Sequence, residues 1–220
     1  MTRRMRILMA ATVAIGLTGR AGAHHARAST IPFYRSSAMN PEWLPAREAS
    51  ASTTHRVAAF RLIDQNENIV TERVFAGKIT VVHFFFTGCG DICPNTTSNI
   101  VALMAALPVS APVQVLSHSV LPNRDSTTAL RRFAAKRGVT DPRWHLLTGD
   151  SAEINRLARG SYFVRVGDGR TYGVATIAHT ESLLLVDSAG RLRGVYAGTL
   201  RLEVDRLAED IRTLLAEAGQ

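Results

Sequence analysis

The fold is decided by the stretch Val81-Val82-His83-Phe84-Phe85-Phe86-Thr87-Gly88-Cys89-Gly90-Asp91-Ile92-Cys93-Pro94. It begins as an apolar, β-prone run, reaches a Thr-Gly turn, and continues from Pro94 as a polar segment of helical character. This pattern predicts a buried strand that leads into a helix. The only two cysteines of the 220-residue chain lie at the junction between them.

Residues 1–28 have the features of a secretory signal peptide. A basic start is followed by an apolar run of about a dozen residues, shorter than the ~20 that a membrane-spanning helix needs. Two small-x-small sites follow, Ala21-Gly22-Ala23 and Ala26-Arg27-Ala28. We therefore predict export to the periplasm with cleavage at one of these sites. An uncleaved segment that anchors the protein to the inner membrane is the alternative.

The charge of the chain excludes a nucleic-acid-binding protein. Five arginines of the signal segment supply most of the formal net charge of +8, which leaves +3 for the rest. Such a weak excess does not make a basic face for nucleic acid. The remaining length is that of one domain, which we expect to be a monomer.

Strand and helix patterns alternate after the signal segment. Residues 29–55 are expected to form a linker or peripheral segment, with Trp43 and Leu44 as docking residues, and residues 56–220 the domain. The expected strands are Val57–Ile63, Ile79–Phe86, Val113–Val120, Trp144–Leu147, Ser182–Val186 and Leu192–Tyr196, with a short extended segment at Ile69–Phe75. The expected helices are Asn95–Leu107, Ser126–Lys136, one ending near Ala158, and Leu202–Ala216. A hairpin or open loop is expected between Tyr162–Val166 and Thr171–Val174.

This order predicts an α/β domain with a thioredoxin-like fold. A central mixed sheet would be flanked by helices, with parallel strands early and an antiparallel hairpin before the C-terminal helix. Asp125 is expected to cap the helix that follows it.

The two cysteines suit metal binding or disulfide chemistry. A thiol at a helix N-terminus has its pKa lowered by the free backbone N–H groups, and the Gly-rich turn should leave the stretch accessible. Two soft thiolates suit Cu(I), with a neutral imidazole as the simplest third ligand. Thioredoxin-type redox motifs are one residue shorter than this C-x-x-x-C. A thiol–disulfide oxidoreductase stays an alternative, as do two inert buried cysteines.

The chain resembles the SCO/SenC copper chaperones of cytochrome oxidase assembly. Phe84 to Pro94 looks like the C-P-D-x-C-P motif of that family, and Ser119 to Asp125 is similar to its S-V-D-P-x-R-D. His179-Thr180-Glu181-Ser182 falls where the family has its copper-binding histidine, and Gly190 to Tyr196 fits its closing hairpin. The resemblance covers about residues 57–216.

This resemblance implies a thioredoxin-fold protein that binds one copper ion, as Cu(I) or Cu(II), through Cys89, Cys93 and His179. It implies delivery of copper to the binuclear site of cytochrome c oxidase subunit II, or maintenance of that site's thiols in the reduced state. Another periplasmic copper or thiol client is the alternative partner.

Three positions depart from the family pattern. Gly90 replaces the first proline of the motif, Leu121 replaces an aspartate, and Ala178 replaces the aspartate that usually precedes the histidine. The last two changes remove carboxylates that would orient ligands and tune affinity.

Other candidates have simpler interpretations. His83 is expected to lie in the core or on a face of the sheet with its polar atoms satisfied. His118, near the end of the next strand, is a weaker alternative as a copper ligand. Asp91 is interpreted as an acid that stabilises the helix start. A peroxidase of the same fold is disfavoured because the Pro/Thr-rich loop expected before its cysteine is absent.

Overall fold

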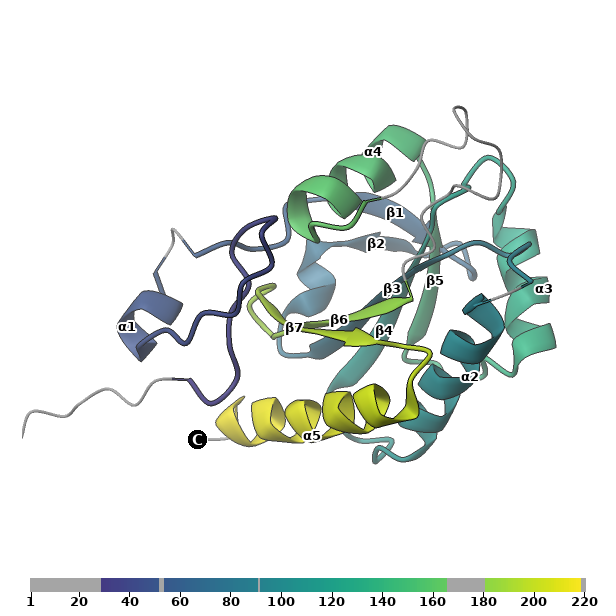
Figure 1. The fold of residues 1–220 in the computed structure, drawn as a ribbon. Coiled ribbons are helices and arrows are strands. Elements are labelled where there is room, and N and C mark those ends of the chain that lie inside the picture. The colour runs from purple at the N-terminus through teal and green to yellow at the C-terminus, as the bar shows by residue number, and fades with distance from the viewer. Residues whose placement is uncertain (1–28, 52–53, 91, 166–180, 219–220) are drawn as a thin grey trace, which may run out of the picture.

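The computed structural model describes residues 29–51, 54–90, 92–165 and 181–218. These residues form a seven-stranded sheet in the order β2-β1-β5-β4-β3-β6-β7 (Figure 1). The strands are β1 (Arg61–Asp64), β2 (Ile69–Thr71), β3 (Ile79–Phe85), β4 (Val113–Ser119), β5 (Trp144–Thr148), β6 (Ser182–Val186) and β7 (Leu192–Ala197). Every residue of β3 and β4 is buried, which is why these strands read as continuous apolar runs in the sequence.

The sheet is mixed. Strands β3, β4 and β5 run parallel, whereas β6 and β7 are antiparallel to their neighbours, as predicted. The parallel strands expected early in the chain are therefore present, but β1 and β2 precede them as an antiparallel hairpin, and β1 also pairs antiparallel with β5. The Asp64 carboxylate accepts hydrogen bonds from the backbone N–H groups of Asn66 and Asn68 (2.8 and 2.9 Å), which closes the turn that reverses the chain.

The helices cover both faces of the sheet (Figure 1). They are α1 (Ala46–Ala49), η1 (Glu72–Phe75), α2 (Ile92–Ala105), α3 (Thr127–Arg137), α4 (Ser151–Arg156), a π-helical turn η2 (Leu157–Ser161) and α5 (Arg201–Ala218). Side chains of α2, α3 and α5 pack on the face that includes Val81 and Phe85, and this core also contains Cys89 and Cys93. We call it the cysteine face. Side chains of α4 and η2 pack on the opposite face, against Val82 and Phe84.

Several elements are shorter or placed differently from their predicted ranges. Only the end of Val57–Ile63 joins the sheet, and the segment Ile69–Phe75 turns into a 3₁₀ helix after Thr71. Helix α2 begins at Ile92 instead of Asn95, so its first turn contains Cys93. The expected hairpin around residues 167–170 lies outside the described residues.

Residues 29–51 lie against the sheet edge formed by β7. The Tyr34 N–H donates to the Leu192 carbonyl (3.0 Å), and the Phe33 ring lies under the guanidinium of the buried Arg193, 4.0 Å from its centre. Leu44 is buried, but Trp43 is 56% exposed, so the expectation that Trp43 docks is wrong.

The observed architecture confirms the predicted thioredoxin-like α/β fold, with a mixed sheet, helices on both faces, a late antiparallel hairpin and a C-terminal helix. None of the helices in the described ranges is long and apolar enough to cross a membrane. The predicted signal segment, residues 1–28, lies outside these ranges.

Candidate metal and redox site

The two cysteines lie where β3 passes into α2. Strand β3 ends at Phe85, and the Cys89 N–H donates to the Phe86 carbonyl (3.2 Å), which closes a tight turn after the strand. Cys93 follows in the first turn of α2. This placement confirms the predicted strand-to-helix junction at the carboxyl end of β3.

Both cysteine side chains are buried, and no disulfide joins them. Cys89 is 3% exposed and Cys93 4%, although Gly88 and Gly90 beside them are exposed. The expectation that the Gly-rich turn makes the thiols accessible is therefore wrong. The turn backbone is accessible, but Phe85 and Phe86 help to enclose the sulfurs in the core of the cysteine face.

Burial and the neighbouring thiol together raise the pKa of Cys93 to about 12. The Cys93 side chain is hydrogen-bonded to that of Cys89, and backbone hydrogen bonds at Phe86 and at Cys93 itself act in the opposite direction. The predicted lowering of this pKa by the helix N-terminus is wrong, because desolvation of the thiolate outweighs the backbone groups. The geometry nevertheless brings two sulfur donors into direct contact, which is what a soft metal ion or a disulfide requires.

A buried carboxyl group holds the turn before Cys89. Asp125 accepts hydrogen bonds from Thr87 N (3.1 Å), Thr87 Oγ1 (2.5 Å) and Ser119 Oγ (2.6 Å), so it joins the ends of β3 and β4. The prediction that Asp125 caps α3 is wrong. Ser126 is the cap, and its Oγ accepts from the Ala129 N–H (3.3 Å). The sequence pattern identified a cap at this loop but shifted it by one residue.

Glu181 is held close to the first turns of α2. The Gly198 N–H donates to the Glu181 carbonyl (2.7 Å), and the Gly198 carbonyl accepts from Asn99 Nδ2 (2.8 Å). A Cβ atom at Gly198 would lie 2.7 Å from the Glu181 oxygen and 2.8 Å from Thr96 Cγ2, so only glycine permits this approach. Sequence reasoning missed Gly198 because a single glycine after a strand looks like any turn residue.

His179 lies outside the described residues, as do Ala178 and Asp91. Within the described ranges, no group of three or more His, Cys, Asp or Glu side chains could hold a metal ion. The three-ligand set therefore stays a prediction, and the structure describes only its two cysteines.

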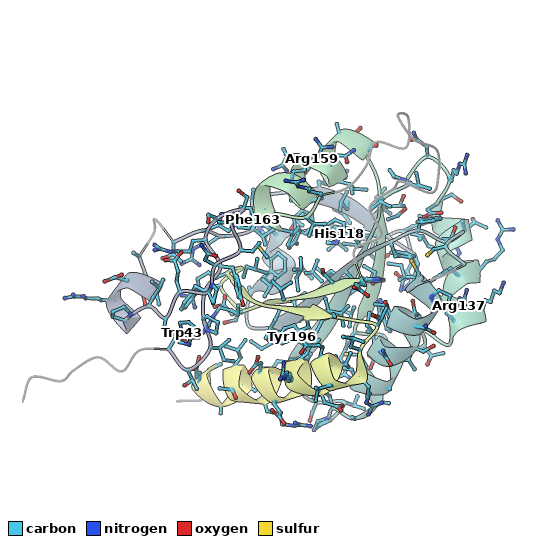
Figure 2. All side chains as sticks on the ribbon, in the orientation of Figure 1. Trp43, His118, Arg137, Arg159, Phe163 and Tyr196 are labelled. Carbon is cyan, nitrogen blue, oxygen red and sulfur yellow. The ribbon has the colours of Figure 1, made fainter. Side chains whose placement is uncertain are left out.

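The other two histidines of the central strands do not join the cysteines. His83 is buried on the cysteine face, where its Nδ1 lies 3.5 Å from Ser117 Oγ. His118 is buried on the opposite face, where its ring stacks on Phe84 (5.1 Å between centres) and contacts Tyr162 edge-on (5.5 Å; Figure 2). Burial lowers the pKa of His83 to about 4 and that of His118 to about 3. His118 is therefore removed as an alternative ligand.

Comparison with known proteins agrees with this architecture. The SCO1/SenC family model matches residues 48–216. The SCO1 protein homolog of Bacillus subtilis strain 168 is 28% identical over 161 residues, which cover 72% of this chain and 82% of that protein.

Two solved structures show the same likeness. BsSco, a member of the Sco family of cytochrome c oxidase assembly proteins in which a disulfide switch was identified, superposes with a TM-score of 0.66 at 26% identity, covering 74% of this chain and 94% of its own. Copper-bound ScoI of Bradyrhizobium japonicum gives a TM-score of 0.61 at 28% identity, covering 72% and 99%. With most of its domain matched by the family model, the chain belongs to the SCO1/SenC family.

Proposed function

We propose that this protein is an exported copper-binding assembly factor that delivers copper to cytochrome c oxidase, or maintains the thiols of its binuclear copper site. The observation that carries the proposal is the contact between the Cys89 and Cys93 thiols at the carboxyl end of β3. Two adjacent sulfurs fit Cu(I), which prefers soft ligands. The copper-bound ScoI of Bradyrhizobium japonicum, with the same fold, supports this assignment.

His179 is the proposed third ligand. It precedes Glu181 by two residues, and Glu181 is held near Thr96 in the early part of α2 through Gly198. An extended chain spans at most about 3.5 Å per residue, so the backbone of His179 lies within about 7 Å of the backbone of Glu181. Strand β6 also enters the sheet beside the end of β3, because Leu183 pairs with His83. Both contacts place Glu181, two residues after His179 in the sequence, near the strand end and the helix start that carry the cysteines.

We further propose that residues 1–28 direct export to the periplasm and that residues 56–220 act as the copper-binding domain. The client in this proposal is subunit II of the oxidase, which receives copper from a reduced dithiol site.

The second candidate function is a thiol–disulfide oxidoreductase. The contact between the two thiols favours it as well, because they can form a disulfide while a client disulfide accepts their two electrons and is reduced to two thiols. The two functions differ in their need for His179, since copper coordination uses an imidazole and disulfide exchange does not.

The test is the copper content of the oxidase in cells that carry His179→Ala, Cys93→Ser or the wild-type protein. Copper delivery predicts that both variants fail, with His179→Ala partly rescued by added copper because its defect is affinity. His118→Leu is the matched control, since it removes a buried imidazole from the opposite face of the sheet. If His179→Ala loads the oxidase like the wild type while Cys93→Ser fails, the protein acts as a reductase.

A further inference from the structure

A pocket of about 320 Å³ lies directly beside the turn that leads from β3 to Cys89, which we call the cysteine turn. Its wall is formed by Thr87, which lies two residues before Cys89, and by one stripe of α3. The α3 residues recur at the spacing of a single helix face, and they are Ala129, Arg132, Phe133, Lys136 and Arg137. From Ala129 to Arg137 this stripe extends for about 12 Å along the helix.

The pocket combines an apolar floor with three cationic side chains. Phe133 is 6% exposed and forms part of the core of the cysteine face. Arg132 and Lys136 are exposed at the rim, and Arg137 is half-buried at the end of the helix (Figure 2). Within the described residues none of these three cations forms an ion pair, whereas Arg131 on the same helix pairs with Glu67 (3.2 Å).

The helix terminus does not fully account for these charges. Lys136 and Arg137 lie in the last turn of α3, where cations suit the negative end of the helix dipole. Arg132 lies outside that turn, and the Nε of Arg137 is buried with no hydrogen-bond partner in the part of the chain that the structure describes. A buried guanidinium nitrogen without an acceptor is costly, and an anionic group that pairs with the Arg137 guanidinium would offset part of that cost.

We propose that this pocket docks an acidic segment of the protein that exchanges copper or electrons with the dithiol. A carboxylate side chain would pair with Arg137, an apolar neighbour would pack on Phe133, and Arg132 and Lys136 would hold further acids at the rim. Because the thiols are buried, a partner must be held at the turn while the sulfurs become accessible. The proposal rests on the proposed function for the identity of the partner, but the pocket itself is independent of copper.

The experiment measures binding of two labelled peptides to the reduced full-length chain by fluorescence anisotropy. One probe is a glutamate-rich peptide with a single phenylalanine, and the other has lysine in place of every glutamate. We expect only the acidic probe to bind, with an affinity that falls as salt is added. The double variant Arg132→Glu with Lys136→Glu should weaken this binding about tenfold.

Two matched controls separate the pocket from net charge and from the dithiol. Arg206→Glu with Arg212→Glu reverses two exposed charges on α5, away from the pocket, and so changes the net charge as much as the α3 variant does. It should change the affinity less than twofold. Cys89→Ser with Cys93→Ser removes the dithiol and should leave peptide binding intact, so a failure of the copper assignment does not affect this test. Equal binding of both peptides, or equal effects of the α5 and α3 variants, would overturn the proposal. A final control adds inorganic phosphate, or chloride at the same ionic strength, to the bound acidic peptide. If phosphate displaces all of the peptide while chloride displaces none, the pocket is a small-anion site and the docking proposal is wrong.

Discussion

On the cysteine face of the sheet, His83 lies beside Ser117 Oγ, which also accepts a hydrogen bond from Trp144 Nε1 (2.9 Å). On the opposite face, both ring nitrogens of His118 and the hydroxyl of Tyr162 are buried without a hydrogen-bond partner among the described residues. Both faces thus bury groups able to bind a metal or a proton. Among the described residues, the cysteine face brings two sulfur donors into a hydrogen bond with each other, at a strand end whose backbone reaches the surface.

The difference shows that burial of a reactive side chain does not by itself make a site. The thiols converge because a tight turn and a helix start position them, and Asp125 holds that turn from the next strand. His118 is packed among aromatic rings that fix its plane, and neither ring nitrogen makes a well-formed hydrogen bond within the described residues. The two faces should therefore respond differently to pH and to substitution.

The largest expected effect is a loss of stability in mild acid. The pKa values of His83 and His118 are lowered in the folded protein, so both bind protons more readily when the chain unfolds. Their contribution to stability is complete above the pKa of histidine in the unfolded chain, about 6.5. It is lost as the pH falls towards their pKa values in the folded protein. We expect the free energy of unfolding to fall by on the order of 3 kcal/mol between pH 7 and pH 5, measured by urea denaturation of the reduced protein. A stability that stays flat over this interval would show that the two imidazoles are not desolvated.

The next effect concerns the carboxyl group behind the cysteine turn. Asp125→Ala removes the acceptor for the partly buried Thr87 and the buried Ser119 and leaves their donors unpaired, so we expect a loss of about 2–3 kcal/mol. The neighbouring Ser126→Ala is the matched control, because loss of the α3 cap should cost about 1 kcal/mol. Thiol labelling by an aromatic disulfide should become faster in Asp125→Ala and stay unchanged in Ser126→Ala. A larger loss of stability in Ser126→Ala, or equal labelling rates in both variants, would contradict this role of Asp125.

Much of this arrangement follows from the sequence, and the failures have physical reasons. The apolar run before Cys89 predicts the central strand because both faces of that strand are buried. The pattern does not show that Asp125 turns inward while Ser126 caps the helix, since either residue type suits either position. The raised pKa of Cys93 depends on packing by residues distant in sequence, and local helix-end reasoning does not capture it.

The smallest effect compares the two histidines directly. In the described part of the chain the His118 nitrogens make no well-formed hydrogen bond. His118→Leu replaces this imidazole with an apolar side chain of similar size and should raise the stability by about 1 kcal/mol at pH 7. His83→Leu should bring no such gain, because it removes the neighbour of Ser117. Thermal or urea unfolding of the two variants in parallel measures the difference. Equal changes in both variants would mean that the two faces do not differ in this respect.

The central claim is that copper binds to the paired thiols at the end of β3. The most direct measurement is a Cu(I) competition titration of the purified protein in its reduced form, its disulfide-oxidised form, and the variant Cys89→Ser with Cys93→Ser. We predict one tightly bound copper ion for the reduced protein and none for the other two forms, with His118→Leu binding like the wild type. If the oxidised protein or the double serine variant takes up Cu(I) as well as the reduced wild type does, copper binds elsewhere and the account is wrong.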